Sequence, residues 1–203
     1  MSTFGIALAG LSLIIWLYLL VFRGQFWRTD PQLEASDSPL PTSFFPSVCA
    51  VIPARNEAEL LPITLRSLLM QDYDGPLSII LVDDHSTDGT AAIAKDTAEA
   101  IGKTSQLQVM SAAPLPSGWS GKLWAMDQGI QAASTASPDY FLLTDADIEH
   151  SAANVRRLVT QAVQQDLDLT SVMVRLRCES FWEHLLIPAF VFFFQKLYPF
   201  RWV

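Results

Sequence analysis

This chain of 203 residues has little positive charge and few cysteines. Lysine and arginine number 13 against 21 aspartates and glutamates, which gives a net charge of -8. The sequence contains no cluster of basic residues that would neutralise a phosphate backbone, so we expect no nucleic-acid partner. The two cysteines, Cys49 and Cys178, lie far apart without the spacing of a metal site, and we interpret both as buried free thiols in a reducing compartment.

Several common cofactor motifs are also missing. No Gly-x-Gly-x-x-Gly follows an apolar run, so a dinucleotide cofactor has no support. Gly121-Lys122 is not a P-loop, because position 116 is proline and Leu123 stands where Ser or Thr is needed. Ser86 has no nucleophile-elbow context. The histidines lack the mutual spacing of a metal site, and we interpret them as structural or surface residues: His85, His150 and His184.

Long apolar runs lie at the two ends of the chain. Residues 4–22 carry no charge and form a helix about 28 Å long at about 1.5 Å per residue, close to the thickness of a bilayer core. A cleaved signal peptide is the alternative, but the chain has no basic start and no good cleavage site after the run. We therefore expect an uncleaved single-pass anchor.

The charges beside this run predict its orientation. Arg23 and Arg28 follow the run and no basic residue precedes it, which favours a cytoplasmic location for the domain that follows. Phe26 and Trp27 suit the membrane–water interface. We expect the protein in the inner (cytoplasmic) membrane, with its domain facing the cytoplasm.

The central part of the chain alternates between continuously apolar runs and helical patterns. This alternation predicts an α/β fold with a mostly parallel sheet and helices on both faces, preceded by one transmembrane helix. The expected strands are residues 48–52, 77–82, 107–110, 140–144 and 169–174. The expected helices are residues 57–70, 88–101, 123–133 and 151–165, the second of them capped by Thr87 or Asp88.

Composition also suggests four regions. The expected boundaries are a membrane anchor at 1–28, a Pro/Ser-rich linker at 29–47, an α/β domain at 48–176, and an aromatic tail at 177–203. The tail is either an amphipathic segment in the plane of the membrane or part of a membrane segment.

Acidic pairs follow two of the expected strands. Asp83-Asp84 ends one apolar run, and Asp145 and Asp147 end another. Ligands of parallel sheets bind beyond the carboxyl ends of the strands, so these clusters are expected in one crevice. Paired carboxylates repel unless a cation or several donors oppose them, and Mg2+ or Mn2+ prefers oxygen ligands and often bridges to phosphate. Helix or turn capping is the simpler alternative for each pair.

Lys122 follows a glycine at the start of an expected helix. Its ammonium group can face a phosphate there, aided by the free N–H groups of the helix start. The simpler alternative is a solvated surface lysine.

Together these residues resemble the family 2 glycosyltransferases with the GT-A fold. The resemblance covers residues 48 to about 174, and the order and spacing of its motifs are more specific than any motif alone. The membrane anchor and the run from Ser117 to Ala125 are most similar to the hopene-associated branch. The matching motifs are residues 51–57 (VIPARNE), 80–90 (ILVDDHSTDGT), Gly121-Lys122 with Ala125 and Gly129, and 142–147 (LLTDAD).

The resemblance implies a role for each matching residue. The donor is a nucleotide sugar, usually linked to UDP, and Asp84 binds the nucleobase with Asp83 beside it. Lys122 lies near the diphosphate or donor sugar, Asp145 contacts ribose or sugar, and Asp147 holds the divalent ion. The residues that shape the nucleoside pocket are Pro53, Ala54 and Glu57. The implied acceptor is lipid-like or hopanoid-like, and the implied reaction inverts the anomeric carbon.

The sequence departs from the family pattern in its last part. The family's catalytic base is a late Asp or Glu, and neither Glu179 nor Glu183 is marked as one, so the base is unassigned. Tyr198 stands where a Gln-x-x-Arg-Trp motif would have glutamine. We expect that the sequence is a fragment of a longer protein.

Two other functions fit parts of the sequence. A membrane-bound sugar-nucleotide-binding protein without catalysis fits the unassigned base. An Asp-x-Asp phosphatase or phosphotransfer domain fits less well, because Glu149 occupies the position at which haloacid-dehalogenase-like phosphatases carry threonine.

Overall fold

The computed structural model describes residues 3–28 and 45–202. The chain divides into two compact units. The larger unit spans residues 33–172, and the smaller one combines residues 1–32 with residues 173–203.

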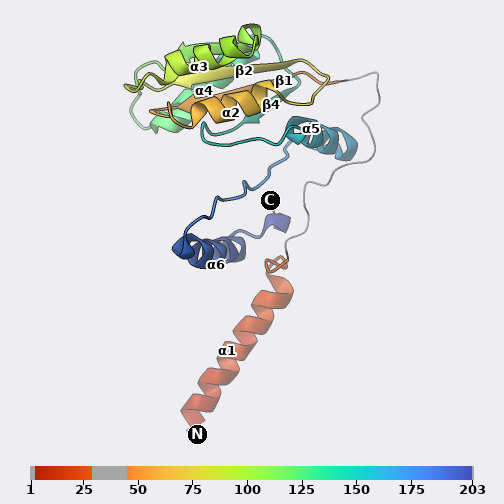
Figure 1. Ribbon diagram of the computed structural model, residues 1–203. Helices are drawn as coiled ribbons and strands as arrows, with labels where there is room; N and C mark the ends of the chain where they lie inside the picture. Colours follow the sequence, from red (N-terminus) through yellow and green to blue (C-terminus); the bar gives the residue numbers. More distant parts are fainter. Residues whose placement is uncertain (1–2, 29–44, 203) are drawn as a thin grey trace. The chain divides into compact units, whose positions relative to one another are not determined.

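The larger unit is built on a four-stranded parallel sheet (Figure 1). Its strand order is β3-β2-β1-β4. The first strand, β1, therefore lies in the interior of the sheet, and later strands are added on both sides of it. Every neighbouring pair is parallel. This confirms the predicted α/β fold. The strands are β1 (Val48–Ala54), β2 (Leu77–Asp83), β3 (Leu107–Ser111) and β4 (Tyr140–Leu143).

Helices cover both faces of this sheet, as its continuously apolar strands require. On one face, α2 (Leu61–Leu69) and α3 (Thr90–Ala100) form one core with β1 and β2. On the other face, α4 (Gly121–Ser134) packs against the same two strands. A third cluster joins α5 (Asn154–Gln165) to the beginning of β1. A short 3-10 helix, Thr104–Gln106, precedes β3.

Gly129 allows α4 to lie very close to the sheet. A Cβ atom at this position would stand 2.4 Å from Cγ1 of Val51 and 3.0 Å from Cγ2 of Val82. Both valines are fully buried and belong to β1 and β2. The missing side chain thus sets the distance between α4 and the central strands.

Three helices start later than the sequence pattern predicts, and the last of them, α5, begins at Asn154 rather than Ser151. The first begins at Leu61 rather than Glu57, with Pro62 in its first turn, where the lack of an N–H costs no helical hydrogen bond. The second begins at Thr90, and its N-cap is Gly89 with φ of 89° rather than Thr87 or Asp88. The Asp88 carboxylate still accepts the N–H of Thr90 at 3.0 Å, so it serves the helix start from one residue earlier.

The predicted strand at residues 169–174 is wrong. These residues form no strand, and Leu169 is 76% exposed. In the described part of the chain, β4 has β1 as a neighbour and no strand on its other side, so this apolar run has no partner there. An apolar groove lies on that side, lined by Leu142, Val159 and Leu169 among others. The irregular stretch continues past Cys178, which is partly exposed rather than buried as predicted, whereas Cys49 is buried.

Within residues 3–28 and 173–202, the smaller unit contains two helices and a short 3-10 turn. Helix α1 (Thr3–Phe22) is apolar and long enough to cross a membrane, and none of its residues is buried within the structure. Helix α6 (Phe181–Leu197) is followed by the 3-10 turn Phe200–Trp202.

Replacing Gly129 by valine should destabilise the fold. The added side chain must displace Val51 and Val82 in a packed core, and overpacking of this kind costs about 1–3 kcal/mol. Urea unfolding of the full chain in detergent measures the change. Gln131→Ala, on the exposed side of the same helix, is the matched control and should change the free energy of unfolding by less than about 0.5 kcal/mol. Equal stability of Gly129→Val and wild type would contradict the close approach of α4.

Candidate active site at the carboxyl edge of the sheet

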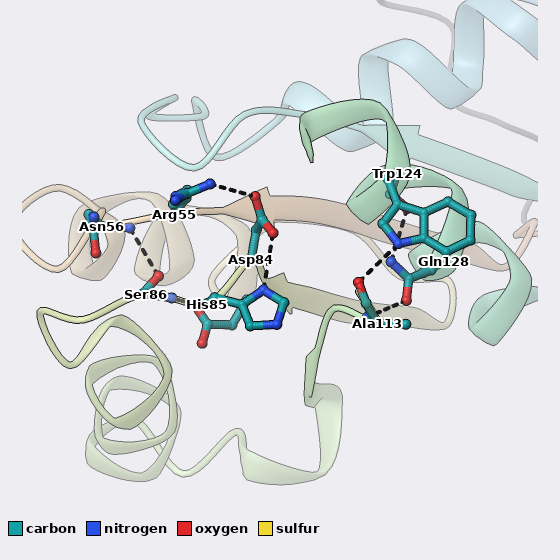
Figure 2. A network of polar contacts seen from close by, with 9 residues as sticks. Arg55, Asn56, Asp84, His85, Ser86, Ala113, Trp124 and Gln128 are labelled. Carbon is teal, nitrogen blue, oxygen red and sulfur yellow. Dashed lines mark hydrogen bonds and ion pairs between the residues drawn. The ribbon is translucent and has the colours of Figure 1, made fainter. Parts of the chain in front are cut away.

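The pairing of β1 with β2 places Asp84 at the edge of the sheet. Ala54 and Asp83 are register partners, and the N–H of Asp84 donates to the carbonyl of Ala54 at 2.8 Å. The side chain of Asp84 is 17% exposed. One carboxylate oxygen lies 3.4 Å from the Arg55 guanidinium, and the other lies 3.3 Å from Nδ1 of His85 (Figure 2). Both contacts are long and face solvent, so they hold Asp84 weakly.

The neighbouring Asp83 has a different environment. It is 9% exposed, and its carboxylate accepts the N–H of Ser86 at 3.2 Å. Its backbone carbonyl accepts the N–H of Ala112, which joins the loop after β3 to the same edge. Asp83 therefore stabilises the loop after β2, whereas Asp84 presents its carboxylate to the surface.

The loops after β1 and β2 are bound to each other by side chains. The N–H of Asn56 donates to Ser86 Oγ at 2.9 Å (Figure 2), and the N–H of Thr87 donates to Asn56 Oδ1 at 2.9 Å. The N–H of Glu57 donates to Thr90 Oγ1 at 3.0 Å. These bonds fix the position of Glu57 relative to the end of β2.

The start of α4 lies against Asp84. A Cβ atom at Gly121 would stand 2.7 Å from Oδ2 of Asp84, so the absence of a side chain here lets the helix start approach the carboxylate. The positive end of the helix dipole favours a negative group at this place. The preceding loop is held to α4 by Trp124 and Gln128, which bond the carbonyl and the N–H of Ala113 at 3.0 and 2.7 Å (Figure 2).

The remaining charges of the site come from the first turn of α4 and from the loop after β4. Lys122, in the first turn of α4, pairs with Asp145 at 2.7 Å. Asp147 is exposed two residues later. The pKa of Glu57 is raised by burial and then by the charges of Asp147, Asp88 and Asp145, while Lys122 acts in the opposite direction. Groups from β1, β2, β4 and α4 are thus close enough to act on one another electrostatically.

This donor set fits a hard divalent ion. Its acidic side chains supply oxygen atoms, which Mg2+ and Mn2+ prefer, and their mutual repulsion favours a bound cation. Among the described residues no three His, Cys, Asp or Glu side chains form a metal cluster by themselves. An ion held here by Asp147 would therefore take further oxygen ligands from a bound phosphate or from water.

His150, interpreted from the sequence as a structural or surface histidine, supports the β4 end of the site. The amide nitrogen of Asn154 donates to Nδ1 of His150 at 2.9 Å, so the neutral ring carries its proton on Nε2 and donates to Thr144 Oγ1 at 3.1 Å. The backbone N–H of His150 donates to Ser67 Oγ. Thr144 immediately precedes Asp145, and these contacts fix the acidic loop to α2 and α5.

Comparison with known proteins identifies the family. A model of glycosyl transferase family 2 matches residues 49–201. The chain belongs to glycosyl transferase family 2. The acidic edge described above lies within the matched range, as do α4 and the loop after β4.

Two curated relatives of this family 2 chain act on different molecules, according to their names. The chain is 30% identical over 181 residues to 4,4'-diaponeurosporenoate glycosyltransferase of Staphylococcus haemolyticus (strain JCSC1435), which covers 88% of this chain and 43% of the relative. It is 29% identical over 136 residues to undecaprenyl-phosphate 4-deoxy-4-formamido-L-arabinose transferase of Sodalis glossinidius (strain morsitans), covering 66% and 38%. The chain thus spans less than half the length of either relative.

A solved structure shares the fold. It is a mannosyltransferase from Pyrobaculum calidifontis in complex with GDP-Man and Mn2+. The match has a TM-score of 0.51 and 27% sequence identity, and it covers 72% of this chain and 39% of the other. This similarity places the parallel sheet of the family 2 chain among GT-A-like folds.

The structure gathers the residues singled out from the sequence and adds others. Pro53 and Ala54 are buried in the last part of β1. Arg55 and His85, which the sequence pattern did not select, both contact Asp84. They are direct neighbours of selected residues, so their position at the strand ends was the available signal. Each selected acidic or basic residue lies at the carboxyl edge of the sheet or at the start of α4: Glu57, Asp83, Asp84, Lys122, Asp145 and Asp147.

Replacing His150 by glutamine should remove part of the pH dependence of stability. Burial lowers the pKa of His150 below 6.5, so the unfolded chain binds more protons than the folded chain between the two pKa values. The free energy of unfolding of the wild type should therefore fall as the pH drops below about 6.5, and His150→Gln should lose that contribution. Chemical unfolding between pH 7.5 and 5.5 measures it.

The control for this experiment is His184→Gln, which changes an exposed histidine. It should keep the wild-type dependence on pH. Identical pH profiles of His150→Gln and wild type would contradict the supporting role of the partly buried imidazole.

Proposed function

We propose that this chain is the donor-binding part of an enzyme that transfers a sugar from a nucleotide sugar to a lipid-like acceptor at the cytoplasmic face of the inner membrane. The observation that carries the proposal is the approach of Asp84, Lys122 and the Asp145–Asp147 loop at one edge of a parallel sheet. Ligands of such sheets bind at this edge. The family assignment supports the same class of reaction.

Asp84 is the proposed contact for the nucleobase. Uracil presents a single N–H between two carbonyl groups, and a carboxylate accepts that N–H well. The present partners of Asp84 are long contacts from the exposed side chains Arg55 and His85, so a base can replace or join them at small cost. We therefore propose UDP as the nucleotide, with Pro53, Ala54 and Glu57 along the nucleoside.

Lys122 and the start of α4 are the proposed contacts for the diphosphate or donor sugar. The Lys122 ammonium already pairs with an oxygen anion, Asp145 Oδ1, and the helix start offers free N–H groups beside it. Asp145 would exchange this contact for the ribose or the sugar. Asp147 would hold Mg2+ or Mn2+, and a bound ion stabilises the negative charge of the leaving nucleoside diphosphate.

The acceptor proposal rests on the relatives and on α1. The names of the two curated relatives contain 4,4'-diaponeurosporenoate and undecaprenyl phosphate, and the second of these is a lipid phosphate. Helix α1 suits an anchor that keeps the domain beside such molecules. Within this class we propose a hopanoid-like acceptor, on the similarity of the anchor and the Ser117–Ala125 run to the hopene-associated branch.

The proposed chemistry is a displacement at the anomeric carbon with inversion, assisted by a base that deprotonates the acceptor hydroxyl. Two late carboxylates have structural partners: Glu179 pairs with Arg177, and Glu183 accepts the N–H of Ser180 at the start of α6. We therefore assign the base to neither. A nucleotide-binding chain without catalysis remains the alternative.

Binding of UDP should depend on Asp147 through the metal ion and, independently of metal, on Asp84. In calorimetry with the full chain in detergent, Mn2+ or Mg2+ should strengthen UDP binding. Asp147→Asn should abolish that metal-dependent gain, because the amide is a weaker ligand without charge. Asp84→Asn should weaken UDP binding at least about tenfold with or without metal, since a hydrogen bond to a charged group contributes about 1.5–3 kcal/mol.

Asp96→Asn, on the exposed surface of α3, is the matched control and should leave binding unchanged. GDP should bind more weakly than UDP if the nucleobase proposal is right. A chain that gives no heat with either nucleotide in Mg2+ or Mn2+ would refute the proposed function.

A further inference from the structure

Helix α6 carries a continuous apolar face that no described residue of its own unit covers. Five large side chains follow one another at intervals of four, four, three and four residues, which places them on one side of an α-helix. Their exposed fractions run from 65% to 44% along the helix: Trp182, Leu186, Phe190, Phe193 and Leu197. Exposed apolar surface of this kind marks an interaction site.

Another side of α6 is already occupied by the end of α1. Phe192 packs edge-on against Phe26, which is 2% exposed, with ring centroids 5.2 Å apart. The Lys196 ammonium lies 4.9 Å from the ring centre of Trp16, a residue of the apolar helix itself. The partner of the exposed face therefore has to be compatible with the surroundings of α1.

Arg23 ties the C-terminal end of α6 to the last turn of α1. Its guanidinium donates to the carbonyl groups of Lys196 and Leu197 at 3.2 and 2.8 Å. Positive charge at this end of a helix is favourable. Gly24 follows with φ of 56°, and a Cβ atom there would stand 2.5 Å from Cβ of Pro199, so the junction is tightly packed.

The dimensions of α6 lie at the lower limit for a membrane span. Its 17 residues give a length of about 26 Å, short of the roughly 30 Å core of a bilayer, and Pro188 lies inside it. Its start is fixed by a capping box between Ser180 and Glu183, which places charge beside the first turn. Exposed apolar side chains of α6 also lie outside this face, since Phe181 and Leu185 are 71% and 54% exposed. A short helix that exposes this much apolar surface suits a lipid environment better than water.

We propose that α6 lies in the membrane–water interface beside α1, with its exposed apolar face in the lipid. This inference rests on the anchoring role of α1 in the proposed function, and it is independent of nucleotide binding. The lipid surface is favoured as the partner because Arg23 and Phe26 continue the end of the apolar helix directly into α6. The aromatic side chains Trp182, Phe190 and Phe193 also suit the interfacial region.

Spin-label accessibility of the full chain in nanodiscs tests the proposal. Single cysteines are placed at Leu186, Phe190 and Phe193 in a Cys49→Ala, Cys178→Ser background, and the discs contain phosphatidylethanolamine and phosphatidylglycerol. All three labels should be more accessible to oxygen than to a water-soluble nickel chelate. Their depths should agree with one another and lie about 5–10 Å below the headgroups. A label at His184, exposed and off the apolar face, should be accessible to the nickel chelate.

Three outcomes would overturn the proposal. Depths that increase steadily from Leu186 to Phe193 would indicate a helix crossing the bilayer. High nickel accessibility would place the face in water, and low accessibility to both reagents would indicate cover by protein or by a second copy of the chain. A label at Ile14 in α1 reports the anchor separately, and UDP calorimetry on the labelled chains reports the proposed function, so these failures are distinguishable from one another.

Discussion

Repulsion between carboxylates gathered at one edge of a parallel sheet is the interaction on which the candidate site depends. Parallel pairing brings the ends of β1, β2 and β4 to the same edge, and each of these ends is followed by acidic residues. The effect is visible at Glu57, whose pKa is raised by burial and by three aspartates from other loops. Lys122 opposes it, and the start of α4 adds a favourable dipole.

Helix α4 contributes both to the packing of the core and to the charges of the candidate site. Gly129 lets the helix press against Val51 and Val82, and Gly121 lets its first turn approach Asp84. The same close approach carries Lys122 to Asp145. A helix held farther from the sheet would keep the fold but separate the ammonium from the acidic loop. Packing in the core thus sets the distance between α4 and the central strands, and this distance determines whether Lys122 reaches Asp145 at the surface.

Much of this arrangement could be predicted from the sequence. Continuously apolar runs identified four strands, and the polar residues after them identified the edge where Asp84, Asp145 and Asp147 lie. Helix starts were less predictable, because Pro62 and Gly89 act through backbone conformation rather than through apolar spacing. The run 169–174 looks like a strand, but strand formation needs a neighbour that an apolar pattern does not reveal. His150 was identified only as a structural or surface histidine, because its particular role comes from contacts with Thr144 and Asn154, which have no sequence motif.

The raised pKa of Glu57 has a consequence for how ligands would affect one another. A proton, a metal ion and a neighbouring ammonium group each reduce the repulsion between the carboxylates at this edge. Binding of one of them therefore weakens the binding of the others. A diphosphate brings new negative charge and restores the demand for a cation. Cation and diphosphate would then be linked thermodynamically, each increasing the affinity for the other by an equal factor.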